Sequence, residues 1–275
     1  MRRISGCTLI IVCLLVLSAC DNGAAPGQGK TLPIAETPPE PAEDCTLVVG
    51  WDPWEPYQYQ DLGGELRGLD VELIRGITAR IGCKTRFLAS DWSSLLEMLK
   101  KGEVDMLPGA TKTMRRAEFA MFSDPYRDET FALFVRTGEK GRLNADKLGD
   151  LLERGFKIGV VSQYLYGDEI TALQDSAEYG DLFVSVPISE MNFSNLMNFE
   201  ADGFLEDPFV AAAVIRKKGL AEEVEAHPIV IKTGEVRLMF AKASVEQSLV
   251  DAINVALGEQ ESDGSYAALL EKYLN

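Results

Sequence analysis

An alternation of strand and helix patterns, starting at residue 45, is the feature that most limits the possible folds. Its first part reads strand, helix, strand, helix, strand, over residues 46–50, 70–81, 85–89, 92–101 and 104–107. Short apolar runs mark the strands, and apolar residues recur at helical spacing in the first helix. Asp91 and Gly102 are good capping residues for the second helix. This order predicts a parallel sheet with right-handed crossovers and a ligand site beyond the carboxyl ends of the strands.

A second unit of the same kind follows. Its strands and helices are expected at residues 157–161, 164–173, 183–186, 189–199, 203–205 and 208–218. A long strand at 235–242 and helices at 245–258 and 266–274 complete the chain. The last two helices have apolar faces without an obvious partner in the second unit, so we expect them to pack on the first.

The predicted fold class is therefore α/β with two lobes. Each lobe is a mostly parallel sheet flanked by helices, and two hinge crossings join them, near residues 127–131 and 231–235. We expect residues 45–128 plus 234–275 to form lobe 1 and residues 129–233 to form lobe 2.

The first 44 residues read as a targeting segment and a tether. Residues 1–19 have a basic start and an apolar core of signal-peptide length, and Leu17-Ser18-Ala19-Cys20 resembles a bacterial lipobox. We expect cleavage before Cys20, lipidation of Cys20, and anchoring at the periplasmic face of the inner membrane. Residues 20–44 are rich in Pro, Gly and Ala, and they indicate a flexible tether.

The cysteines fit an oxidising compartment. Cys45 and Cys83 remain as an even pair once the signal peptide and the lipidated cysteine are set aside. Each comes directly before a predicted strand. If these strands are parallel neighbours, the two cysteines lie at one edge of the sheet and can form a disulfide. The alternative is a pair of buried free thiols.

Charge and composition disfavour several function classes. The net charge of −16 argues against nucleic acid or an anionic membrane surface as the main partner, because both require basic patches. The single histidine, His227, gives little support to a Ser-His-Asp triad or a multi-histidine metal site. The chain has no glycine-rich phosphate loop. We therefore expect no metal, no cofactor and no enzymatic activity.

Six segments, taken together and in order, resemble the family 3 extracytoplasmic solute-binding proteins, the amino-acid receptors of bacterial ABC importers. They are LVVGWDPWEPYQY, GLDVELIRGITARIG, DWSSLLEMLKKGEVDMLPGATKTMRRAEFAMFSDPY, KIGVVSQYLYGDEI, ADGFLEDPFVAAAVIRKKG and SDGSYAALLEKYLN. The resemblance extends from about residue 46 to the C-terminus. It implies a type II periplasmic-binding-protein-like fold with the ligand between the lobes.

The resemblance also assigns a carboxylate site. It matches Arg116, in Thr113-Met114-Arg115-Arg116, to the arginine that forms a bidentate pair with the ligand α-carboxylate. Gly109 and Thr111 match positions that complete this site or contact the amino group. Arg115 is interpreted as a solvated neighbour.

The other lobe contributes further candidates. Asp207 matches the carboxylate that receives the ligand ammonium, although Asp207-Pro208 is also a good N-cap and first-turn pair. Ser162 and Tyr164 are expected to begin a helix whose free N–H groups add to the carboxylate site. Gln163-Tyr164 departs from the Ser-Gly-Thr pattern usual in the family.

Three residues are expected to line the cleft beside the ligand side chain, namely Asp52, Trp54 and Trp92. The alternative for each tryptophan is packing in the core. Aromatic side chains that stack on the ligand favour an apolar or a cationic side chain, the latter through cation–π attraction.

The function predicted from the resemblance is a monomeric receptor that captures an amino acid or similar small zwitterion and delivers it to an ABC transporter permease. Two alternatives are a ligand-sensing module for a membrane signalling partner and a periplasmic dehydratase of prephenate-like acids. In the second alternative, Glu206 serves as the acid.

Overall fold

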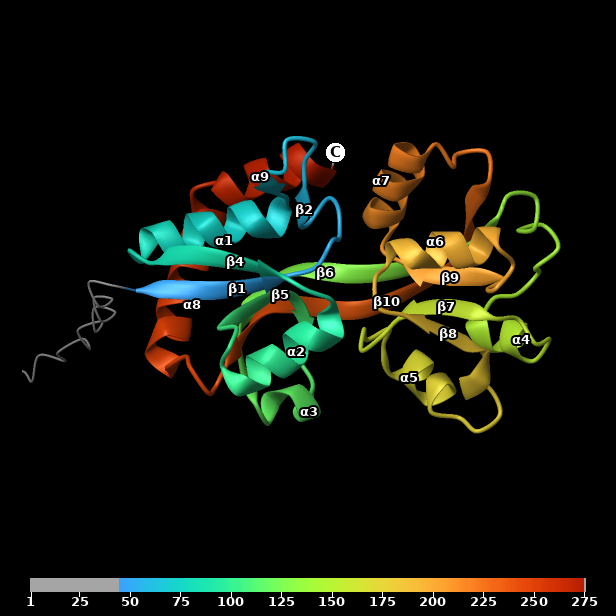
Figure 1. Cartoon of the computed structure of the whole chain (residues 1–275), viewed down its shortest axis with the longest axis horizontal. Helices are drawn as coiled ribbons and strands as arrows, with labels where there is room; N and C mark the ends of the chain where they lie inside the picture. The colour runs from blue at the N-terminus through green and yellow to red at the C-terminus, as the bar shows by residue number, and fades with distance from the viewer. Residues whose placement is uncertain (1–44, 275) are drawn as a thin grey trace, which may run out of the picture. The chain divides into compact units, whose positions relative to one another are not determined.

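The computed structural model describes residues 45–274, which form an α/β fold with two lobes (Figure 1). The elements of the lobe that contains the first described residues are β1 (Thr46–Trp51), β2 (Tyr59–Gln60), β3 (Leu66–Arg67), α1 (Leu69–Arg80), β4 (Lys84–Ala89), α2 (Trp92–Lys101), β5 (Met106–Thr111), α3 (Met114–Ala117), α8 (Gln247–Ser262) and α9 (Ser265–Leu274). Those of the other lobe are α4 (Leu148–Leu152), β7 (Ile158–Val161), α5 (Asp168–Gln174), a 3₁₀ turn (Gly180–Leu182), β8 (Phe183–Val186), α6 (Glu190–Met197), β9 (Gly203–Glu206) and α7 (Pro208–Lys218). The long strands β6 (Ala120–Arg136) and β10 (Val224–Ala241) extend through both.

Eight strands hydrogen-bond in the order β4-β1-β5-β10-β6-β9-β7-β8. β1 is parallel to β4 and β5 in one lobe, and β7 is parallel to β8 and β9 in the other. The long strands pair antiparallel with their neighbours. Each lobe therefore has a mostly parallel sheet, and the predicted fold class is confirmed.

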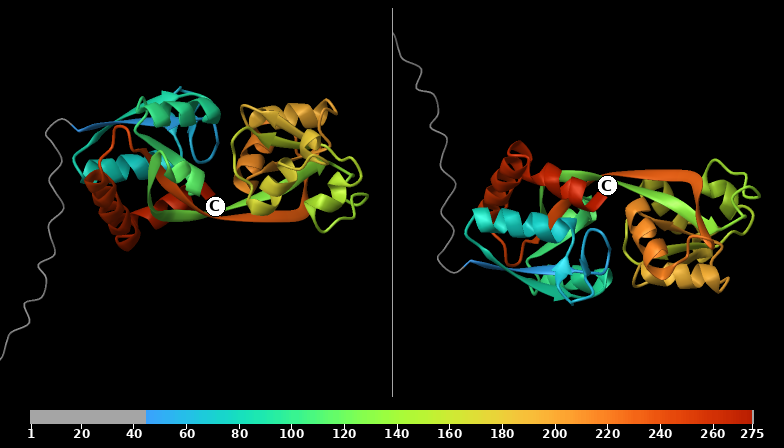
Figure 2. Two further views of the ribbon diagram at one scale, coloured as in Figure 1. Left: turned by 90° about the horizontal axis from the view of Figure 1, so that it is seen from below. Right: turned by 90° about the horizontal axis from the view of Figure 1, so that it is seen from above.

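The two lobes are joined by β6 and β10, which run side by side between them (Figure 2). The two strands pair from Ala120 opposite Ala241 to Arg136 opposite Val224. The sequence predicted two crossings in this region but not a continuous pair of long strands. The exact residue boundaries of the lobes stay a prediction.

The last two helices pack on α1. The Lys272 Nζ donates to Glu72 Oε1 at 2.7 Å, and the Arg80 Nη2 lies 2.5 Å from Asp263 Oδ2. The buried Gln260 donates from Nε2 to the carbonyl oxygen of Leu73 at 3.4 Å. The C-terminal segment thus completes the lobe in which the described chain begins.

Local capping signals correctly predicted two helices. Asp91 accepts from Ser94 N at 3.0 Å at the start of α2, and Gly102 ends this helix with a φ of 73°. The bounds of α7 match the predicted 208–218, with Asp207 as its N-cap. In both helices, short-range hydrogen bonds decide where the helix begins, so the sequence alone was enough.

The helix expected at 164–173 begins only at Asp168, so the prediction for its start was wrong. Gln163 turns the chain with a φ of 63°, and Tyr164 N donates to Val161 O at 3.2 Å. Gly167 then occupies the N-cap position. Ser162 and Tyr164 therefore lie in a loop, and their N–H groups do not form a helix N-terminus.

The strand predicted at 104–107 extends further than expected, since Gly109-Ala110-Thr111 is the end of strand β5. Pro108 has no N–H to donate, and it lies where the pairing of β5 with β10 shifts register, since Leu107 is opposite Met239 and Ala110 is opposite Arg237. Proline within a sheet is accommodated at such irregularities.

Cys45 and Cys83 form a disulfide with an S–S distance of 1.99 Å, which confirms the bonded alternative. Strands β1 and β4 are parallel neighbours, with Thr46 opposite Lys84, so the two cysteines meet at one edge of the sheet.

The predicted signal peptide, Cys20 and the tether lie outside the described residues. Within residues 45–274, none of the helices has both the length and the apolar character needed to cross a membrane.

Candidate functional site

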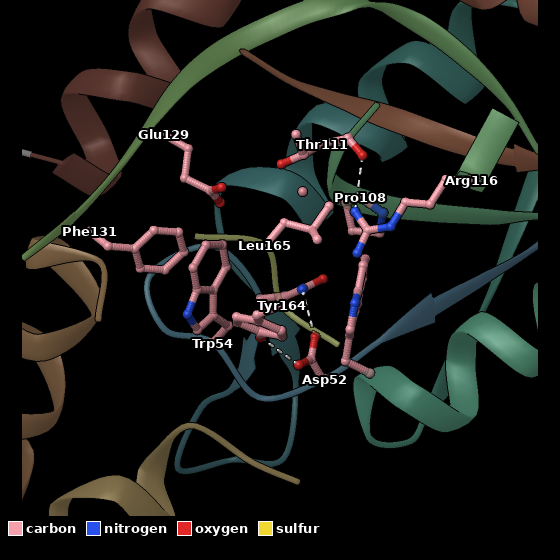
Figure 3. Close-up of a pocket in the computed structure, with 12 residues that line it drawn as sticks. Asp52, Trp54, Pro108, Thr111, Arg116, Glu129, Phe131, Tyr164 and Leu165 are labelled. Atoms are coloured by element: carbon pink, nitrogen blue, oxygen red, sulfur yellow. Dashed lines mark hydrogen bonds between the residues drawn. The ribbon is translucent and has the colours of Figure 1, made fainter. Parts of the chain in front are cut away.

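A small cavity of about 30 Å³ lies between the lobes (Figure 3). It lies at the carboxyl ends of β1 and β5, where the parallel sheet predicts a ligand site. Loops after β1 and β7, the start of α2, the end of β5, helix α3 and the middle of β6 surround it. Its lining residues are Asp52, Trp54, Gln58, Trp92, Pro108, Gly109, Thr111, Arg116, Glu129, Phe131, Tyr164 and Leu165.

Arg116 forms one wall of this cavity. Thr113 caps the short helix α3 by accepting from Arg116 N at 3.1 Å, and this places the arginine side chain inward, with 7% of the residue exposed. Its Nη1 donates to Thr111 O and its Nη2 to Gln163 O, both at 3.0 Å. A guanidinium has five N–H donors, so donors remain for a carboxylate. Burial lowers the pKa of Arg116 to about 10, so the side chain stays cationic at neutral pH.

Asp52 forms part of the cavity wall at the end of β1. Its Oδ2 accepts from the Tyr164 hydroxyl at 2.9 Å, and its Oδ1 accepts from Gln58 Nε2 at 3.2 Å. Burial raises the pKa of Asp52 to about 6, and the Tyr164 hydroxyl opposes this shift by stabilising the charged form. Because Tyr164 belongs to the loop after β7, this hydrogen bond joins the two lobes.

The two tryptophans are both buried and part of the cavity lining, so the core and site alternatives hold together. Trp54 is 4% exposed, and its Nε1 donates to Glu206 Oε1 of the other lobe at 3.1 Å. Trp92 packs edge-on against Tyr164 with ring centroids 5.9 Å apart, and the Arg116 guanidinium lies 5.5 Å from the Trp92 ring centroid. The buried Trp92 Nε1 has no hydrogen-bond partner within the described residues.

Glu129 adds a second carboxylate to the cavity from the middle of β6. Its Oε2 accepts from Thr233 Oγ1 of β10 at 3.0 Å, and its Oε1 lies 4.0 Å from Arg127 Nη2. Burial raises the pKa of Glu129 to about 7, and the Arg127 charge acts in the opposite direction. Figure 3 shows Glu129 and Arg116 reaching the cavity from different sides.

Asp207 does not line the cavity. Its Oδ1 accepts from Phe209 N at 2.8 Å and from Val210 N at 3.2 Å, as its capping role requires. Its Oδ2 accepts from the Tyr57 hydroxyl at 3.1 Å. Burial raises the pKa of Asp207 above its usual value, and the neighbouring Arg127 charge offsets only part of this rise. In this arrangement Asp207 connects the lobes through Tyr57 instead of facing the cavity.

Ser162 lies beside the cavity and not in its wall. It lines an adjoining groove that shares Arg116 and Tyr164 with the cavity. Its N–H donates to Val186 O at 2.8 Å. The structure thus brings together seven of the nine candidate ligand residues, namely Asp52, Trp54, Trp92, Gly109, Thr111, Arg116 and Tyr164.

Five lining residues were not among the nine candidates, namely Gln58, Pro108, Glu129, Phe131 and Leu165. Glu129 and Phe131 are two residues apart in β6, so they point to the same face of the strand. Recognising residues 120–136 as a strand would have revealed this alternation.

Within residues 45–274, no group of three or more His, Cys, Asp or Glu residues is arranged to hold a metal ion.

Comparison with known proteins places the chain in a family. The model of the bacterial extracellular solute-binding proteins, family 3, matches residues 47–275. A probable amino-acid-binding protein, YxeM of Bacillus subtilis, is 25% identical over 270 residues, which is 97% of this chain and 94% of the relative. A probable histidine-binding protein of Neisseria gonorrhoeae is 26% identical over 266 residues, 96% of this chain and 94% of the relative.

The solved structures agree with this placement. An ancestral arginine-binding protein bound to arginine superposes with a TM-score of 0.73 at 25% identity, and covers 85% of this chain and 100% of its own. A histidine kinase sensor domain with similarity to periplasmic binding proteins, at 23% identity and a TM-score of 0.72 over 85% of this chain and 97% of its own, shows the fold alone. The chain belongs to the bacterial extracellular solute-binding proteins, family 3.

Proposed function

We propose that this protein is an extracytoplasmic receptor that captures an amino acid or similar small zwitterion for an ABC importer. The observation that carries the proposal is the buried Arg116 guanidinium in the wall of a cavity between two lobes. Its planar fork of donors matches a carboxylate in two-point geometry, which a lysine cannot reproduce. The carbonyls of Thr111 and Gln163 hold the fork in place.

In this proposal the ligand carboxylate binds Arg116, and the aromatic side chains of Trp54, Trp92 and Tyr164 surround the rest of the molecule. Asp207 stays a candidate for the ligand ammonium, as the resemblance implies. Contact with the ammonium would require the Tyr57 hydroxyl to leave Asp207 Oδ2. Thr111 and Gly109 supply further polar groups beside the arginine.

Four polar contacts connect the lobes around the cavity, and a ligand held there touches both sides. They are hydrogen bonds from Trp54 to Glu206, from Tyr57 to Asp207, from Tyr164 to Asp52, and from Arg116 to the carbonyl oxygen of Gln163. A ligand that contacts both lobes favours the closed arrangement, since its affinity for that state is higher. The permease would recognise the closed receptor, and lipidation at Cys20 would keep the monomer at the periplasmic face of the inner membrane. In this role the protein binds its ligand without converting it.

A thermal-shift panel on the chain lacking residues 1–20 tests the proposal. The panel contains amino acids, decarboxylated amines, dicarboxylates and prephenate. We expect an amino acid to stabilise the protein, by about 4 kcal/mol at a concentration 1,000 times its Kd. A shift only with dicarboxylates that lack an ammonium would refute the zwitterion site, and turnover of prephenate would indicate an enzyme.

A further inference from the structure

When its two carboxyl groups are ionised, the cavity holds more negative than positive protein charge. Asp52 and Glu129 both line it and are 4% and 5% exposed, whereas Arg116 is the one cationic side chain among its lining residues. A neutral zwitterion brings one charge of each sign and leaves this excess unchanged. Buried charges without partners are unfavourable, so the cavity is better matched by a ligand with an additional positive charge.

Arg127 does not remove the excess negative charge. Its side chain is 6% exposed, and it lies against aromatic rings, with its guanidinium carbon 4.1 Å from the Tyr57 ring centroid. Its charge is shared among three buried carboxyl groups, since it opposes the rise in pKa that burial causes at Asp70, Glu129 and Asp207. Its closest carboxylate contact is with Glu129, at 4.0 Å, which is too long for a hydrogen bond. Glu129 is therefore incompletely neutralised.

Asp52 and Glu129 differ in whether a carboxylate oxygen is still free to accept a hydrogen bond from a ligand. Both oxygens of Asp52 already accept hydrogen bonds, from Gln58 and Tyr164. Glu129 accepts one side-chain hydrogen bond, from Thr233 to Oε2, and no residue donates to its Oε1 within the described chain. Figure 3 shows the Glu129 carboxylate directed into the space beside Trp54 and Leu165. A ligand cation there would also lie near the Trp54 ring, which favours positive charge.

We infer that Glu129 is a selectivity residue that receives a positively charged side-chain group of the ligand, an ammonium or a guanidinium. The site thereby prefers cationic amino acids to neutral ones of the same length. This inference rests on the proposed function, in which Arg116 holds the α-carboxylate. The alternative is that Glu129 only stabilises Arg127 and the β6–β10 pairing through Thr233.

Isothermal titration calorimetry with matched ligand pairs separates these possibilities. Arginine and citrulline have nearly the same shape but differ in side-chain charge, and lysine and norleucine form a second such pair. We expect the wild-type protein to bind the cationic member of at least one pair about tenfold or more tightly, as expected for a buried charge contact. In Glu129→Gln, the cationic ligand should weaken until this preference is lost, while the neutral ligand keeps its affinity within about threefold.

Asp128→Asn is the matched control, because it removes the same charge from the adjacent exposed residue of β6. It should keep the wild-type preference. Equal weakening of both members of a pair in Glu129→Gln would show a structural role and overturn the inference. Equal wild-type affinities within both pairs would also overturn it without any variant, and would leave the proposed function intact. Absence of binding by any amino acid to the wild-type protein would instead refute the proposed function.

Discussion

Replacing Arg116 with alanine should greatly weaken ligand binding. The side chain is 7% exposed, and both Nη atoms are fixed by backbone carbonyls, so little reorganisation is needed before it can bind a carboxylate. Removing one partner of a buried charge pair costs roughly 2–5 kcal/mol. At about 1.4 kcal/mol per factor of ten, the Kd should rise by about 30-fold at least.

The assay is isothermal titration with the amino acid that gives the largest thermal shift. Arg115→Ala is the matched control, since it removes an equal charge from the neighbouring exposed residue and should leave the Kd within about threefold of wild type. Arg116→Lys keeps the charge but loses the planar fork, and it should bind with an intermediate affinity. A wild-type Kd in Arg116→Ala, with unchanged thermal stability of the free protein, would refute the role of this residue.

Two further predictions concern stability. Burial raises the pKa of four carboxyl groups above their unfolded values. The pKa rises to about 6 for Asp52 and Asp70, and to about 7 for Glu129 and Glu206. The folded protein therefore binds more protons than the unfolded chain between pH about 4.5 and 7. In urea unfolding, the free energy of unfolding should be lower at pH 7.5 than at pH 5, by several kcal/mol. A higher value at pH 7.5 would contradict these shifts. Replacing both disulfide cysteines with serine opens a loop with a sequence separation of 38 residues, and chain entropy predicts a loss of about 3–4 kcal/mol in the same assay. Unchanged stability in the double variant would contradict that prediction.

The sequence predicted those parts of the fold that depend on local signals. Helices α2 and α7 were placed correctly because their caps, Asp91, Gly102 and Asp207, act within a few residues. Strand β6 was not recognised, because its central segment Asp124 to Glu129 is largely charged and lacks the alternation of a half-buried strand. Within that segment, Glu129 lines the cavity and Arg127 packs against the Tyr57 ring. The charged residues that β6 contributes to the candidate site and its surroundings therefore also remove its sequence signature.

The site was predictable where the family motif covers it, and not where this chain departs from the motif. Arg116, Thr111 and Trp54 follow from the resemblance and line the cavity. The loop from Ser162 to Gly167 was wrongly predicted to begin a helix. Its turn depends on the positive φ of Gln163 and on the tertiary contact between Tyr164 and Asp52. Such contacts between residues distant in sequence leave no local pattern.

In the proposed function, the receptor holds the free α-carboxylate of an amino acid. The most direct measurement is a calorimetric titration of the best-binding amino acid beside its methyl ester and its decarboxylated amine. Because neither analogue offers a carboxylate to the Arg116 guanidinium, we predict that both bind at least about 30-fold more weakly. Affinities equal to that of the free amino acid would show that Arg116 does not bind the ligand carboxylate.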